Sequence, residues 1–177
     1  MSVRLAFEIV LITGTLFAGA VESVAQNRSV YTSLDAKQCR TIKTETTGAG
    51  DYEGRCRGVG GYSLTLLEGD LRQNIVVVTP KGAKHSLELW DVISGGFSSV
   101  GPKAEWRLAP RNGPVALIFR YDIAQEDPGK RISYLTVAKI TRNEICVTDK
   151  ISPGPNANNE ARLAADSATT KPCLKTH

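Results

Sequence analysis

The four cysteines of this chain constrain its fold more than any other feature of the sequence. Four cysteines can pair in three ways, and proximity along the chain favours Cys39–Cys56 and Cys146–Cys173. Neither pair has the CxxC spacing of a redox motif or a zinc knuckle. We therefore predict two structural disulfides, each stabilising the fold by about 3 kcal/mol, and neither a metal site nor a cofactor.

The first residues, Met1–Ala25, have the pattern of a cleaved secretory signal. Arg4 provides the positive charge, Ile9–Val21 is an uncharged and mostly apolar run, and Ser23–Ala25 places small residues before a cut after Ala25. A cut after Ala18–Ala20 is the alternative. The apolar run is shorter than the roughly 20 residues that a membrane-spanning helix needs, and no later stretch is longer. We therefore expect an exported chain with no membrane span after the signal.

The charge balance excludes one class of partner. The chain has 177 residues and a net charge of +4, and its basic residues are scattered along the sequence. Nucleic-acid readers normally show a basic stripe with interleaved aromatic residues, so we predict no nucleic-acid partner. A mixed solvated surface is the favoured interpretation, and attraction to anionic lipid headgroups or cell-wall polymers is the alternative.

Alternating apolar and polar residues predict a mainly antiparallel β domain over residues 26–177. Turn sequences separate the candidate strands at regular intervals, as in a meander that forms a barrel or a sandwich. The clearest candidate strands are Tyr62–Leu67, Arg72–Thr79, Val115–Ile123, Ile132–Ile140 and Glu144–Lys150.

Two segments in the middle of the chain are less clear. Ser86–Val92 fits a strand or a helix, and we favour a short strand. Ser94–Lys103 contains three glycines and one proline, which predicts a long loop. Ala104–Leu108 then alternates again as a strand should.

The end of the chain changes to a helical period. Alanines recur at helical spacing from Ala157 to Ala168, which predicts one helix over about residues 156–169. Asn156 is the expected N-cap, with its side chain accepting an early backbone N–H. An alanine stripe buries little area, so we expect the Cys146–Cys173 disulfide to hold this helix.

Catalytic chemistry has little support in the sequence. Gly96–Gly101 resembles a nucleophile elbow, but its second glycine is one position late. A serine hydrolase would need His85 as the base for Ser98 or Ser99. We therefore predict no catalytic residues.

The favoured binding surface is the stretch between Phe97 and Trp106, because loops on rigid scaffolds often carry binding. Phe97, Lys103, Trp106 and Arg107 are the predicted binding residues. The alternative is that the two aromatic residues belong to the core and the loop only connects strands.

Several sequence segments resemble a group of uncharacterised exported proteins of proteobacteria. The resemblance covers most of the chain after the signal, and it is most specific in the stretch that ends at Trp106 and Arg107. It implies a periplasmic location and supplies no activity. The segments that carry it are Tyr31–Asp35 leading to Cys39, Gly54–Cys56, Gly60–Tyr62, Phe97–Arg107, Asn156–Asn158, Ala161–Arg162 and Cys173.

Together these features predict a non-enzymatic periplasmic binding module whose partner is another protein or an envelope component. An envelope hydrolase that uses the serine-bearing glycine loop is one alternative, and a purely structural envelope protein is another. A hydrolase should place His85 within hydrogen-bond reach of Ser98 or Ser99.

Overall fold

The computed structural model describes residues 26–127 and 129–176, and their ten strands form one sheet. The order along the sheet is β10-β9-β8-β7-β5-β4-β3-β2, with β1 added to β7 and β6 added to β5. The strands are β1 (Arg28–Ser33), β2 (Arg40–Glu45), β3 (Asp51–Arg57), β4 (Ser63–Gly69), β5 (Arg72–Val78), β6 (Lys84–Ser86), β7 (Ser98–Ala109), β8 (Gly113–Ala124), β9 (Arg131–Ile140) and β10 (Ile145–Ile151). The mainly β fold class is therefore confirmed, as is the meander from β7 to β10.

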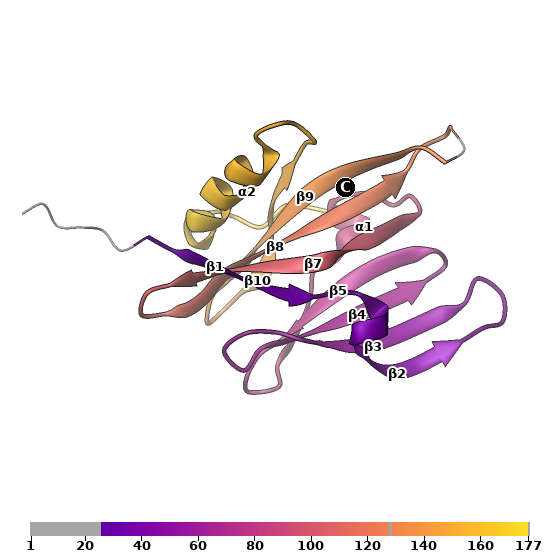
Figure 1. Ribbon diagram of the computed structural model, residues 1–177, viewed down its shortest axis with the longest axis horizontal. Helices are drawn as coiled ribbons and strands as arrows, with labels where there is room; N and C mark the ends of the chain where they lie inside the picture. Colours follow the sequence, from indigo (N-terminus) through magenta and orange to yellow (C-terminus); the bar gives the residue numbers. More distant parts are fainter. Residues whose placement is uncertain (1–25, 128, 177) are drawn as a thin grey trace, which may run out of the picture.

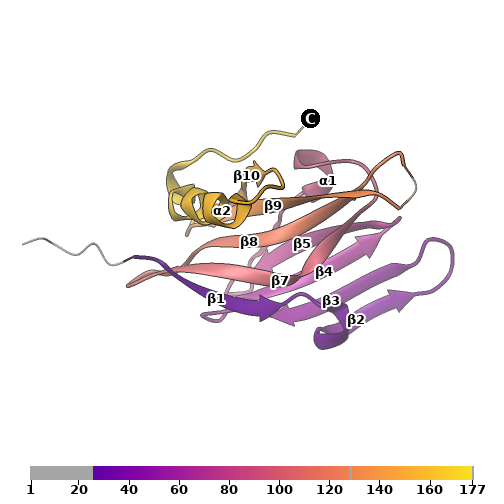
Figure 2. The same ribbon diagram turned by 45° about the horizontal axis from the view of Figure 1, so that its top comes forward.

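The sheet curls so that one of its faces encloses the main core. Buried side chains from β3, β4, β5, β7, β8, β9 and β10 belong to one apolar cluster, which the fully buried Trp106 joins. Figures 1 and 2 show the half with β7–β10 lying over the half with β2–β5. Where β10 approaches the second half, the Lys150 ammonium donates to the carbonyl of Ile93 at 3.1 Å. This bond ties the two halves on that side.

Strand β8 is apolar on both faces, because each face meets a different layer. Leu117 and Phe119 point into the main core, whereas Ala116 and Ile118 belong to a second cluster with helix α2 (Ala157–Asp166). The apolar residues of this strand are therefore buried on both faces, between β9 and β7. Figure 2 shows α2 lying across the outer side of β8 and β9.

The alanine stripe allows α2 to lie close to the sheet. Ala161 and Ala165 are fully buried, and so is Ala168 in the short 3-10 helix η2 (Ala168–Thr170). The predicted N-cap bond is wrong in one respect: Asn156 is the cap residue, but its side chain accepts no N–H. Its backbone carbonyl instead accepts the amides of residues 159 and 160.

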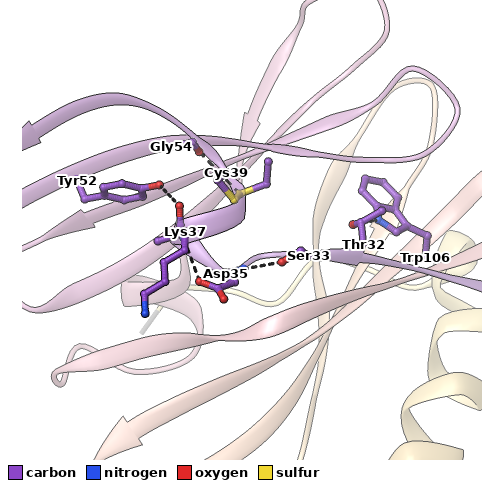
Figure 3. The surroundings of a disulfide bond; sticks show 10 residues. Thr32, Ser33, Asp35, Lys37, Cys39, Tyr52, Gly54 and Trp106 are labelled. Atoms are coloured by element: carbon purple, nitrogen blue, oxygen red, sulfur yellow. Dashed lines mark hydrogen bonds between the residues drawn. A yellow bond between two sulfur atoms is a disulfide. The ribbon is translucent and has the colours of Figure 1, made fainter.

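Both predicted disulfides are present. Cys39–Cys56 joins the start of β2 to β3, and Cys146–Cys173 joins β10 to the tail that follows η2. Figure 3 shows how the first disulfide lies beside the turn between β1 and β2, where the 3-10 helix η1 (Ala36–Gln38) is capped by Asp35. The first disulfide therefore fixes β2 and β3 against each other.

The predicted strand over Ser86–Val92 is wrong. Strand β6 ends at Ser86, and Leu89–Val92 forms the short helix α1. The side chain of Asn74 accepts the Leu89 amide at 3.3 Å and so caps this turn from a strand that is remote in sequence. Glu88, just before the helix, adopts a left-handed conformation with φ of 49°.

The predicted loop over Ser94–Lys103 is also wrong, because β7 already begins at Ser98. The glycine and proline that indicated a loop lie in a bulge, where the pairing with β8 shifts between Val100 and Ala104. A side chain at Gly101 would meet the Arg120 Cβ at 2.8 Å, so the bulge requires glycine there.

The predicted signal, Met1–Ala25, lies outside the described residues. None of the helices described for residues 26–127 and 129–176 is long and apolar enough to cross a membrane.

Candidate functional site

A groove of about 290 Å³ lies between α2 and the bulged part of β7. Its floor is apolar and is formed by Ile118, Leu135 and Ala161. Its rim is polar, with side chains from β1, β7, β8 and α2. The rim residues are Tyr31, Lys103, Glu105, Arg120, Asn158 and Arg162, and we call this set with its floor the helix–strand groove.

The β7 bulge places Lys103 on the rim. Lys103 pairs in register with Ser33 of β1, and the preceding carbonyl of Pro102 accepts the Leu34 amide at 2.9 Å. The Lys103 side chain is exposed and takes part in no hydrogen bond or ion pair with the residues that the structure describes. Its ammonium is therefore available to a ligand.

Arg162 and Glu105 form an ion pair on the rim of the groove. The Arg162 Nε donates to the Glu105 carboxylate at 2.7 Å, and its Nη2 donates to the Tyr31 hydroxyl at 2.9 Å. Burial raises the pKa of Glu105, but the hydrogen bonds from Arg162 and Ser29 outweigh burial and hold that pKa below its usual value. The same pair raises the pKa of Arg162. Both groups of this ion pair are therefore charged, and each neutralises the other.

A second ion pair lies next to the groove along β7, and its arginine is buried. Arg107 is only 5 % exposed, and its Nε and Nη2 donate to the two carboxylate oxygens of Asp166 at 2.9 and 2.8 Å. Arg107 also donates to Ser29 Oγ at 2.6 Å, while that hydroxyl donates to Glu105 at 2.5 Å. We call this network of Ser29, Glu105, Arg107, Arg162 and Asp166 the polar clamp.

The polar clamp connects three elements that are far apart in the sequence. Ser29 comes from β1, Glu105 and Arg107 come from β7, and Arg162 and Asp166 come from α2. Burial raises the pKa of Asp166, but hydrogen bonds from Arg107 and Asn27 lower it below its usual value. The clamp therefore fixes the wall of the groove with charges that are already paired.

The structure separates the four predicted binding residues. Lys103 lies on the groove rim and Arg107 in the polar clamp. Trp106 is fully buried, and its indole N–H donates to Thr32 Oγ1 at 2.9 Å. Figure 3 shows the two side chains next to each other. Phe97 is 48 % exposed at the far end of β7, under the guanidinium of Arg72 at 5.4 Å from the ring centroid.

Sequence reasoning missed Glu105 on β7 itself and rim residues that come from other elements. Tyr31, Glu105 and Arg162 join only because β1 and α2 both pack beside β7. One signal was available: Asn158 and Arg162 are spaced by one helical turn, on the same side as the alanine stripe. Nothing in the sequence indicates that β1 lies beside them.

The serine–histidine pair that a hydrolase would need is not formed. Ser98 is buried and its hydroxyl lies 2.6 Å from that of Tyr121, while Ser99 accepts from Arg131. His85 pairs in register with Val77, at the opposite end of β5 from Arg72, which pairs with Ser98. The structure therefore does not form the Ser–His pair that the hydrolase alternative requires.

Comparison of the chain with protein-family models, with curated proteins and with solved structures gave no match.

Proposed function

We propose that this protein is an exported, periplasmic binding module without enzymatic activity, and that its helix–strand groove binds a ligand with an anionic group and an apolar part. Two disulfides support an oxidising compartment, and the signal pattern of Met1–Ala25 supports export. An envelope component or a segment of another periplasmic protein would supply such a ligand.

One observation carries the proposed ligand class. Lys103 lines the same groove as the apolar floor residues, and within the described chain no carboxylate pairs with its ammonium. The nearby Glu105 is already engaged by Arg162 and Ser29, so it does not neutralise Lys103. Arg120 adds a second cation on the rim, with one of its N–H groups donating to Ser133 Oγ at 3.0 Å. A carboxylate could bind these cations while its apolar part covers Ile118 and Leu135.

A titration with octanoate tests this proposal, because octanoate combines a carboxylate with an apolar chain. We expect backbone NMR signals of Lys103, Ile118 and Ala161 to shift, with saturation. Lys103→Gln should weaken binding by about tenfold, since one charge-assisted hydrogen bond is lost.

Lys81→Gln is the matched control. Lys81 lies in the exposed turn after β5, and its substitution removes the same charge as Lys103→Gln. It should leave octanoate affinity unchanged. Equal weakening by both variants, or shifts that avoid the groove, would reject the groove as the binding site.

A further inference from the structure

Two arginines face each other across the β2–β3 ladder. Arg40 and Arg55 are direct register partners, and each adjoins a cysteine of the Cys39–Cys56 disulfide. Like charges placed directly opposite each other destabilise a sheet. The disulfide keeps this unfavourable pair in place, because it fixes the register at the adjacent position.

A third arginine and an aromatic ring complete a hollow on this face. Arg57 follows Arg55 by two residues and so shares its side of β3. Together with Arg40 and Tyr62 these residues line a hollow of about 460 Å³. The Tyr62 ring is positioned by Trp106, with ring centroids 6.1 Å apart.

Tyr62 also lines a second hollow, of about 450 Å³, on its other side. Here Arg111 from the β7–β8 turn and Arg142 from the β9–β10 turn contribute their side chains. Both hollows are lined by Tyr62, so five arginines line two hollows that share one aromatic residue. We call the set Arg40, Arg55, Arg57, Arg111, Arg142 and Tyr62 the arginine surface.

The charge of the arginine surface is not compensated within the described part of the protein. Over residues 26–127 and 129–176, none of its five guanidinium groups takes part in a side-chain hydrogen bond or ion pair. Of the nearest acidic residues along the chain, Glu53 is the register partner of Lys43, whose ion pair is with Glu45, and Glu144 pairs with Lys139 at 2.5 Å. The arginine surface therefore carries an excess of positive charge that is not neutralised there.

We propose that the arginine surface is a second ligand site, distinct from the helix–strand groove, and that it binds phosphate-bearing anions. Guanidinium groups match phosphate oxygens with paired N–H donors, and several of them can share a ligand that carries more than one phosphate. Binding would also relieve the repulsion between Arg40 and Arg55. A free polyphosphate or the headgroups of an anionic lipid surface would supply this chemistry.

Titration calorimetry with inorganic pyrophosphate tests the site, with vesicles of phosphatidylglycerol in phosphatidylcholine as a second arm. We expect binding in at least one arm, weakened by added salt because exposed charges are screened. Arg55→Gln and Arg111→Gln should each weaken it by about tenfold, since each removes charge-assisted hydrogen bonds. Binding of pyrophosphate identifies a free phosphate ligand, and binding of vesicles alone identifies lipid headgroups.

Arg131→Gln is the matched control, because Arg131 lies at the start of β9, at the opposite end of the strands from the β9–β10 turn. It should leave both arms unchanged, as should Lys103→Gln in the groove. Absence of binding in both arms would overturn the proposal. Arg131→Gln weakening the binding as much as Arg55→Gln would also overturn it, because the net charge of the protein would then explain the effect. Circular dichroism checks that each variant keeps its fold.

Discussion

At the scale of single residues, the polar clamp shows what alternation along a strand can and cannot reveal. The sequence Glu105-Trp106-Arg107 alternates, so Trp106 must face away from its two charged neighbours. The sequence does not show which face is covered. Trp106 faces the main core, while α2 packs on the other face and β1 lies beside β7 in the sheet, so Arg107 is buried as well.

Removing the counter-charge of Arg107 should destabilise the fold strongly. Asp166→Asn leaves a guanidinium that is 5 % exposed without its carboxylate, and we expect a loss of about 3 kcal/mol in the free energy of unfolding. Urea denaturation followed by tryptophan fluorescence measures this loss. Asp127→Asn, which breaks an exposed ion pair with Lys130, should change stability by less than about 0.5 kcal/mol. Similar stabilities for the two variants would contradict the role given to the clamp.

At the scale of elements, the sequence predicts strands and helices well where the periodicity is local. The strands β8, β9 and β10 and the alanine-striped helix α2 are confirmed in this way. Two errors, over 86–92 and 94–103, have a common physical cause. In each case a remote element decides the conformation: Asn74 caps α1, and pairing with β8 turns a glycine-rich segment into a bulged strand.

The second disulfide should matter most to the last element of the chain. The paired variant Cys146→Ser with Cys173→Ser removes the link between β10 and the tail that follows η2. We expect a loss of about 3 kcal/mol, with α2 amides exchanging faster than those of β8 and β9. Hydrogen exchange read by mass spectrometry measures both. Uniformly faster exchange over α2 and the sheet would show that the helix does not open separately.

At the scale of the whole molecule, the meander sorts charge to opposite ends of the strands. The β5–β6, β7–β8 and β9–β10 turns lie at one end, shown at the lower left in Figure 1, and carry Lys81, Arg111 and Arg142. The β4–β5 turn and the segments around α1 and between β8 and β9 lie at the other end. They carry more acidic than basic residues: Asp70, Glu88, Asp91, Glu126 and Asp127, against Lys130 and Arg131. Basic residues that are scattered in the sequence are thus gathered by the topology, which no local pattern predicts.

This polarity should be measurable without any ligand. The variant Arg111→Glu with Asp127→Lys keeps the net charge and reduces the separation of charge between the two ends. We expect it to elute from a cation exchanger at lower salt than the wild type, because the resin binds the basic end. The paired variant Arg111→Lys with Asp127→Glu is the control and should elute with the wild type. Coincident elution of all three proteins would show that net charge alone governs binding.

The polar clamp also sets the order in which the chain can finish folding. A chain made or delivered from its N-terminus presents β1 and β7 long before α2, so the carboxylate of Asp166 arrives late. Until then Arg107 has no counter-charge, and its side of β7 must stay hydrated. The sheet therefore reaches its final stability only when nearly the whole sequence, including α2, is present.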